Sequence, residues 1–271
     1  MELLDDTSPN VQQALLDEFQ KHGPAAALFL RQIADGPNRM ISFYARWYLN
    51  ELRFADPVAE FRGFIRSLNF ELETGVFLLC RTANRDLNIA AFTKPLDAMA
   101  ARCRELLAEP SNAREKCRVL NRVLFHEYGF RADTDRERDR ASNPGRDLVD
   151  QVLARKKGTP ASLCIIYLLV ARRLGFDLEP VMPPEHFVVG CYAETEPFFV
   201  DACEQGALRT PRAMNTLLRR ERATATASRF APAPVREVLG RCCRNLAAAY
   251  DAAGNKTQAR LYAEFADELD E

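Results

Sequence analysis

The sequence predicts an α+β protein that is mostly helical, with a helical N-terminal region, a small core of one helix and antiparallel strands, and a C-terminal helical hairpin. Apolar residues recur at helical spacing through the first 128 residues, the period changes from 3.6 to 2 after Gly175, and helical spacing returns from Val235. Helices that are segregated from strands favour α+β over repeated βαβ units. We therefore expect three regions, at residues 1–130, 131–215 and 230–271.

Composition limits the class of protein. The chain has 271 residues, enough for one or two domains, and its 47% hydrophobic and 28% charged residues are typical of a globular protein. Its 37 basic and 38 acidic residues give a net charge of −1, which offers no general attraction to nucleic acid or anionic lipid. The longest apolar run, Leu163 to Ala171, is shorter than the ~20 residues of a spanning helix. The acidic start of the chain lacks the features of a signal peptide, so we expect a cytoplasmic protein with no membrane partner and no general affinity for nucleic acid.

Cysteine is abundant, and without an export signal the thiols are expected to be reduced. No Cys-x-x-Cys or His-x-x-x-His pair occurs, and His22, His126 and His186 are far apart in sequence. We therefore expect no metal site and no cofactor. The open question is whether one thiol is functional among Cys80, Cys103, Cys117, Cys164, Cys191, Cys203, Cys242 and Cys243.

The N-terminal region carries clear helix starts. Ser8-Pro9 and Asp56-Pro57 each combine a capping side chain with a proline at the first helical position, and Ser111-Asn112 is a third start. Aromatic residues are dense from Phe43 to Phe70, which is typical of the inner face of a helical bundle.

The core begins after a charged segment. Residues Phe130 to Pro144 have no apolar period, so we expect a solvated loop and a boundary there, followed by a short helix from about Arg146 to Ala154. Thr159 is a good N-cap, Pro160 a good first helical residue and Gly175 a good stop, so an apolar helix should lie between them.

Three strands should follow this helix. Val181-Met182 predicts a short strand, and two longer segments, 186–192 and 197–201, predict a hairpin. If Tyr192 pairs with Pro197, then His186, Asp201 and Cys203 share one face with Val188, and the backbones of His186 and Asp201 lie roughly 7–8 Å apart as diagonal neighbours. A carboxylate that orients an imidazole is half of a nucleophile–His–Asp triad. The alternative is an ordinary histidine and a turn aspartate, and a slip of one residue would separate the two side chains.

The tail predicts two helices around Gly254-Asn255. The spacing of Leu246, Tyr250, Ala259 and Ala266 resembles one tetratricopeptide unit. A single repeat cannot bury its own apolar face, so we expect it to pack on the rest of the protein rather than to form a peptide-binding array.

Four motifs together carry a resemblance to a known family: Gly158-Thr-Pro-Ala-Ser-Leu163, Ala171-Arg-Arg-Leu-Gly175, Pro184-Glu-His-Phe187 and Val200-Asp-Ala202. They are similar to the transglutaminase-like superfamily, and more closely to its bacterial SirB-type branch. The resemblance covers about Asp147 to Leu208, extends more weakly to Phe70–Tyr128 and to the tail, and is absent from the first sixty or so residues. It implies a papain-like core with tetratricopeptide-like helices behind it, and places the family's catalytic histidine at His186 and its aspartate at Asp201.

The family's cysteine does not carry over. The resemblance places that cysteine at the start of the core helix, where the helix dipole and the histidine lower the pKa of the thiol, and Pro160 stands there in this chain. Two neighbours are tentative substitutes. Ser162 would point away from the expected direction, and Cys164 would lie on the correct face but one turn deeper, where a buried apolar role is the alternative. Cys203 could face His186, but the family geometry places no nucleophile there.

Three functions remain open. The first is a non-catalytic transglutaminase-like protein, a pseudoenzyme that binds an unknown protein partner or a ligand. The second is a thiol-dependent acyl-transfer enzyme of the peptidase, amidase or transglutaminase type, in which Cys164 attacks, His186 acts as base and acid, and Asp201 orients the histidine. The third is a nucleic-acid-associated regulator that uses the basic stretch from Arg209 to Arg229. The sequence does not fix the oligomeric state.

Overall fold

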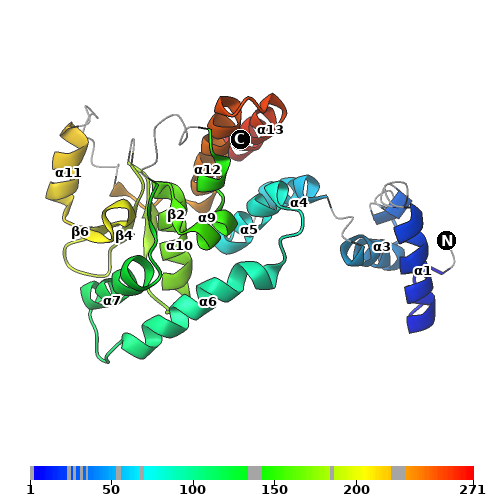
Figure 1. Ribbon diagram of the computed structural model, residues 1–271, viewed down its shortest axis with the longest axis horizontal. Coiled ribbons are helices and arrows are strands. Elements are labelled where there is room, and N and C mark those ends of the chain that lie inside the picture. The colour runs from blue at the N-terminus through cyan, green and yellow to red at the C-terminus, as the bar shows by residue number, and fades with distance from the viewer. Residues whose placement is uncertain are drawn as a thin grey trace. The chain divides into compact units, whose positions relative to one another are not determined.

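The computed structural model describes all residues except 1–2, 23–25, 27–28, 31–32, 35, 53–55, 68–69, 134–141, 184–185 and 221–229. The chain divides into two compact units, Met1–Glu60 and Phe61–Glu271 (Figure 1). The three regions expected from the sequence have different boundaries and stay a prediction. The fold class is the predicted one, a mostly helical α+β protein with one small antiparallel sheet.

The first unit has a small aromatic and aliphatic core of its own. Helix α1 (Pro9–His22) begins at the predicted proline, and α3 (Arg39–Glu51) is capped by the side chain of Asn38. Tyr48 is completely buried, and its ring meets that of Phe19 edge to face at a centroid distance of 5.4 Å. The prediction that the aromatic residues face inward is wrong for Phe43, which is 63% exposed, and Phe54 lies outside the described residues.

The helices from residue 57 onward follow the sequence signals. Helix α4 (Pro57–Ile65) is preceded by Asp56, whose carboxylate accepts from the Val58 N–H, and α7 (Ala113–Asn121) begins with a capping box formed by Asn112 and Glu115. Helix α5 (Leu72–Ala83) and helix α6 (Ile89–Leu106) lie between them, and a π-helical turn, η1 (Arg122–Glu127), continues α7. Leu96, Met99, Ala100 and Cys103 of α6 are buried, as their spacing predicts.

The central element of the second unit is α10 (Pro160–Arg173). It is preceded by the short helices η2 (Pro144–Arg146) and α9 (Val149–Arg155) and by a two-residue parallel pairing of β1 (Arg131–Ala132) with β2 (Lys157–Gly158), which the sequence did not predict. The predicted loop before η2 lies mostly outside the described residues. Every residue from Ala161 to Ala171 is buried, so α10 is enclosed on all sides rather than on one face. Gly175 ends it with φ +69°, a conformation that glycine adopts without strain.

The sheet has four antiparallel strands in the order β3–β4–β5–β6. They are β3 (Glu179–Val181), β4 (Val188–Cys191), β5 (Phe198–Asp201) and the unpredicted β6 (Ala207–Arg209). Val189 pairs with Val200 and Cys191 with Phe198, which confirms the predicted hairpin register. At the outer edge, β3 contains Pro180, whose carbonyl accepts from the N–H of Ala233 at 2.8 Å.

Helices cover the sheet and complete the unit. Met214 of α11 (Pro211–Arg220) packs with Val181, Val188 and Phe199. The tail is a hairpin of α12 (Val235–Ala252) and α13 (Lys256–Asp270), which turns at Gly254 and Asn255 as predicted. Arg62 of α4 bonds to Glu264 and Glu268 of α13, each at 2.8 Å, so the tail packs on the rest of this unit.

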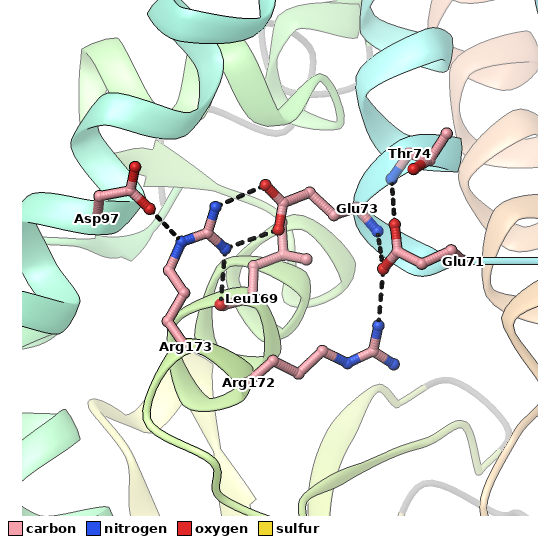
Figure 2. Close-up of polar contacts among 7 residues, drawn as sticks. All are labelled: Glu71, Glu73, Thr74, Asp97, Leu169, Arg172 and Arg173. Atoms are coloured by element: carbon pink, nitrogen blue, oxygen red, sulfur yellow. Dashed lines mark hydrogen bonds and ion pairs between the residues drawn. The ribbon is translucent and has the colours of Figure 1, made fainter.

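The C-terminal end of α10 is held by ion pairs to α5 and α6 (Figure 2). The guanidinium of Arg173 donates to Glu73 at 2.7 Å and to Asp97 at 2.6 Å, and it also reaches the carbonyl of Leu169. Arg172 donates to Glu71, whose carboxylate caps α5. This end of α10 is therefore joined to two helices that lie more than 50 residues earlier in the sequence. Among the described helices, none is both long and apolar enough to cross a membrane.

Candidate functional site

The candidate site is the region around the N-terminus of α10, where the sequence places His186, Asp201 and the possible nucleophiles. Thr159 is the N-cap and Pro160 is the first helical residue, as predicted. Pro160 is exposed, and its side chain offers no group that could attack a substrate. Gly158 allows this tight start, because a Cβ at its position would come within 2.5 Å of the Ser162 hydroxyl and 2.8 Å of Val152.

Ser162 is fully committed to the helix cap. Its Oγ accepts from the backbone N–H of Thr159 at 2.9 Å and donates to the carbonyl of Arg146 at 2.8 Å. The side chain is only 1% exposed. A hydroxyl in these bonds stabilises the first turn and has no open path to a substrate.

A buried carboxylate continues this network toward the tail. Asp147 accepts from the Thr159 hydroxyl at 2.9 Å and from the side chain of Asn245 on α12 at 3.0 Å. Burial raises the pKa of Asp147, and the hydrogen bonds from Thr159 and Asn245 oppose that shift. The sequence reasoning missed Asp147 and Asn245, because the contact joins residues that share no motif.

Cys164 lies one turn further into the helix and is completely buried. Its Sγ donates to the carbonyl of Phe187, the residue after His186, at 3.3 Å. Burial raises the pKa of this thiol well above its ordinary value, and the nearby Cys203 and Asp201 add to the shift. The thiol is therefore neutral, and a neutral thiol is a poor nucleophile.

Asp201 ends β5, and its side chain makes three hydrogen bonds within the part of the chain that the structure describes. One carboxylate oxygen accepts from the N–H groups of Cys203 and Glu204, which caps the short helix η3 (Ala202–Glu204). The other oxygen pairs with Arg209 of β6 at 3.1 Å. The observed register places Asp201 on the same face as Val188 and Phe199, as predicted from the sequence.

His186 lies just before β4 and is half-buried, with its backbone N–H bonded to the carbonyl of Pro183. The preceding two residues of its motif lie outside the described residues. The hairpin brings His186 to the same end of the sheet as Asp201, whose carboxylate contacts go to Arg209 and to the η3 backbone. The roles of His186, Asp201, Cys164 and Ser162 in catalysis stay predictions.

The remaining thiols behave like Cys164. Burial is the largest cause of a raised pKa for all eight cysteines, including the half-buried Cys203, whose pKa rises to about 12. Near Cys203, Arg146 forms an ion pair with the buried Asp133 at 2.9 Å. No cluster of metal-ligating side chains occurs among the residues that the structure describes.

Comparison with known proteins identifies the family of this region. A family model described as "Transglutaminase-like superfamily" matches residues 90–244, more than half of the chain. The match therefore includes α6, α7, the sheet and the first half of α12 as well as α10.

Several curated proteins are similar to the chain. A "UPF0162 protein" of Xylella fastidiosa (strain Temecula1 / ATCC 700964) is 30% identical over 190 residues, which are 66% of this chain and 64% of that protein. A "UPF0162 protein" of Vibrio cholerae is 25% identical over 119 residues, 44% of this chain and 43% of that protein. The human "F-box only protein 21" is 26% identical over 202 residues, 72% of this chain and 30% of that protein. The chain thus spans slightly less than two thirds of the Xylella protein. No solved structure matches it.

Proposed function

The chain belongs to the transglutaminase-like superfamily, and from this premise we propose that it is a non-catalytic member that acts by binding a protein or a ligand. The proposal includes the SirB-type branch and a tetratricopeptide-like character for the α12–α13 hairpin, as the sequence motifs suggest. His186 and Asp201 are then retained as parts of the fold, while Pro160 occupies the position of the nucleophile.

One observation carries the proposal: no ionisable thiol stands at the start of α10. Pro160 is there, the Ser162 hydroxyl is used by the cap, and the Cys164 thiol is enclosed and bonded to a backbone carbonyl. Acyl transfer by a cysteine needs a thiolate, and burial disfavours the thiolate of Cys164.

The contacts of Asp201 support the same reading. An aspartate that orients a catalytic histidine uses a carboxylate oxygen for the imidazole. In this chain one carboxylate oxygen caps η3 and the other pairs with Arg209, and these are structural contacts that a non-catalytic member would also keep.

The alternative is a thiol enzyme that uses Cys164, His186 and Asp201. One contact favours it: the Cys164 Sγ lies 3.3 Å from the carbonyl of Phe187, which is adjacent in sequence to His186. The thiol therefore lies beside the segment that leads from His186 into β4.

Alkylation of the native full-length chain separates the two functions. The chain is treated with iodoacetamide at neutral pH, and the labelling of each cysteine is followed by peptide mass spectrometry. We expect Cys164 to react only as fast as the protein unfolds. His186→Ala should change this rate only if it changes the stability of the fold. Cys203→Ser is the control, because it removes the half-buried thiol near Asp201 and leaves Cys164 in place.

Rapid labelling of Cys164 that slows in His186→Ala would instead support the enzyme. Binding gives a second readout: a partner held by the wild type should be held equally by Cys164→Ser, because no bond is made or broken. Dependence on the thiol, or turnover of an amide substrate that Cys164→Ser abolishes, would contradict the proposal.

A further inference from the structure

A second site lies at the opposite end of α10 from Pro160. A partly open cavity of about 410 Å³ is lined by the start of α7, the loop that follows α10, and the end of β4 with the turn after it. Figure 1 shows α7 beside the sheet. This volume is within the ~300–1,000 Å³ that ligand pockets occupy. The lining residues are Asn112, Ala113, Lys116, Cys117, Gly175, Phe176, Asp177, Leu178, Cys191, Ala193 and Glu194.

The walls of this cavity are largely apolar. Phe176, Leu178 and two alanines contribute hydrocarbon surface. The thiols of Cys117 and Cys191 are each 1% exposed, and burial raises the pKa of both, so they are neutral. Neutral thiols behave as small apolar groups, and they extend the hydrocarbon lining rather than provide a charge.

Lys116 brings a positive charge to the wall. Its ammonium lies 5.2 Å from the centroid of the Phe176 ring, a cation–π contact. Among the described residues no carboxylate pairs with it, whereas Arg114 on the same helix pairs with Glu194 at 2.9 Å and lies over the Phe198 ring. A half-buried lysine without an anionic partner favours an anion that enters from outside.

The carboxylates that line the cavity disfavour an anion with more than one negative charge. Glu194 is already neutralised by Arg114, and Asp177 is exposed to solvent. Because Asp177 also lines the cavity, a dianion such as phosphate would meet more repulsion there than a single carboxylate.

We propose that this cavity binds a small apolar molecule that carries one carboxylate, with the apolar body against Phe176, Leu178 and the two thiols and the carboxylate at Lys116. The site is independent of the α10 N-terminus, so it does not rest on the function proposed above.

The probe is 3-phenylpropionate, added to the full-length chain and followed by isothermal titration calorimetry and by ligand-observed NMR. We expect saturable binding that weakens about tenfold when 3-phenylpropanamide, its neutral counterpart, replaces it, because the charge-assisted bond to Lys116 is lost. Lys116→Gln should weaken binding of the acid by a similar factor and leave binding of the amide almost unchanged.

Lys256→Gln is the matched control, because this lysine is exposed on α13, pairs with Asp251 and lies outside the cavity. Ala113→Leu fills part of the cavity and should weaken both the acid and the amide. Circular dichroism verifies that each variant is folded. No saturable binding of the acid at millimolar concentration, or equal binding by wild type and Lys116→Gln, would overturn the proposal.

Discussion

The two ends of α10 are held by different kinds of interaction. At the N-terminal end, Thr159, Ser162 and Asp147 form a buried network of hydrogen bonds, made mainly by hydroxyl and backbone groups. At the C-terminal end, Arg172 and Arg173 form half-exposed ion pairs with α5 and α6 (Figure 2). At the N-terminal end, where the sequence motifs predict the family's nucleophile, the polar groups are buried and hydrogen-bonded, while the other end is charged and adjoins a cavity. The two proposals above follow this difference, because they assign no catalysis to the hydrogen-bonded end of α10 and a ligand to the end beside the cavity.

We expect the largest loss of stability from a substitution in the middle of α10, between the two ends. Leu168 is completely buried, and Leu168→Ala should cost about 3 kcal/mol of unfolding free energy, because it removes apolar contacts and leaves a cavity. Urea denaturation measures this loss. A loss much below about 1 kcal/mol would mean that the helix is not enclosed on all sides.

At the N-terminal end, we expect Ser162→Ala to cost about 2 kcal/mol, because the substitution leaves the Thr159 N–H and the Arg146 carbonyl without their buried partner. The control is Thr216→Ala, which removes an exposed hydroxyl bonded to the Arg212 carbonyl and should change stability by less than about 0.5 kcal/mol. Equal effects of the two substitutions would contradict the closed cap.

At the C-terminal end, Arg173→Gln should cost about 1 kcal/mol, less than Ser162→Ala, because its ion pairs are partly screened by solvent. The difference from wild type should shrink in molar salt. Arg244→Gln, which breaks an exposed pair with Asp270, is the matched control and should have a smaller effect. A cost for Arg173→Gln that did not change with salt would indicate packing rather than charge.

The smallest effect concerns pH. Burial raises the pKa of Asp147, so the folded state holds a proton more tightly than the unfolded state does. The contribution of Asp147 to stability should then be greatest below the unfolded pKa of ~4 and be lost as pH rises through the folded value. Asp147→Asn lacks this titration, so the urea midpoint of the wild type should decline relative to that of the variant across this range. A relative increase would mean that the hydrogen bonds to the carboxylate outweigh burial.

Local signals in the sequence predicted the central helix and the β-hairpin of the core. Thr159, Pro160 and Gly175 define both ends of α10 because capping and turn conformations depend on a few adjacent residues. The short turn between Tyr192 and Pro197 predicted the β4–β5 register, because loop length fixes the pairing of a hairpin.

Long-range contacts could not be predicted in the same way. The pairing of Asp201 with Arg209 depends on β6, a three-residue strand too short to show a period. The bond between Asp147 and Asn245 joins residues 98 positions apart, and the cavity beside Lys116 collects its walls from three segments. Phe43 was expected inside the helical bundle because it lies in an aromatic-rich segment. It is exposed, because aromatic density does not indicate which side of a helix is covered.

The bond between Ala233 and Pro180 has a consequence for self-association. A sheet edge with free N–H and C=O groups can pair with another chain and start aggregation. Here β3 is only three residues long, contains a proline that lacks an N–H, and has its Pro180 carbonyl occupied by Ala233. The opposite edge strand, β6, is also three residues long and is followed after one residue by Pro211. Both edges of the sheet thus offer little to an incoming strand, which protects the apolar core of this unit from edge-to-edge assembly.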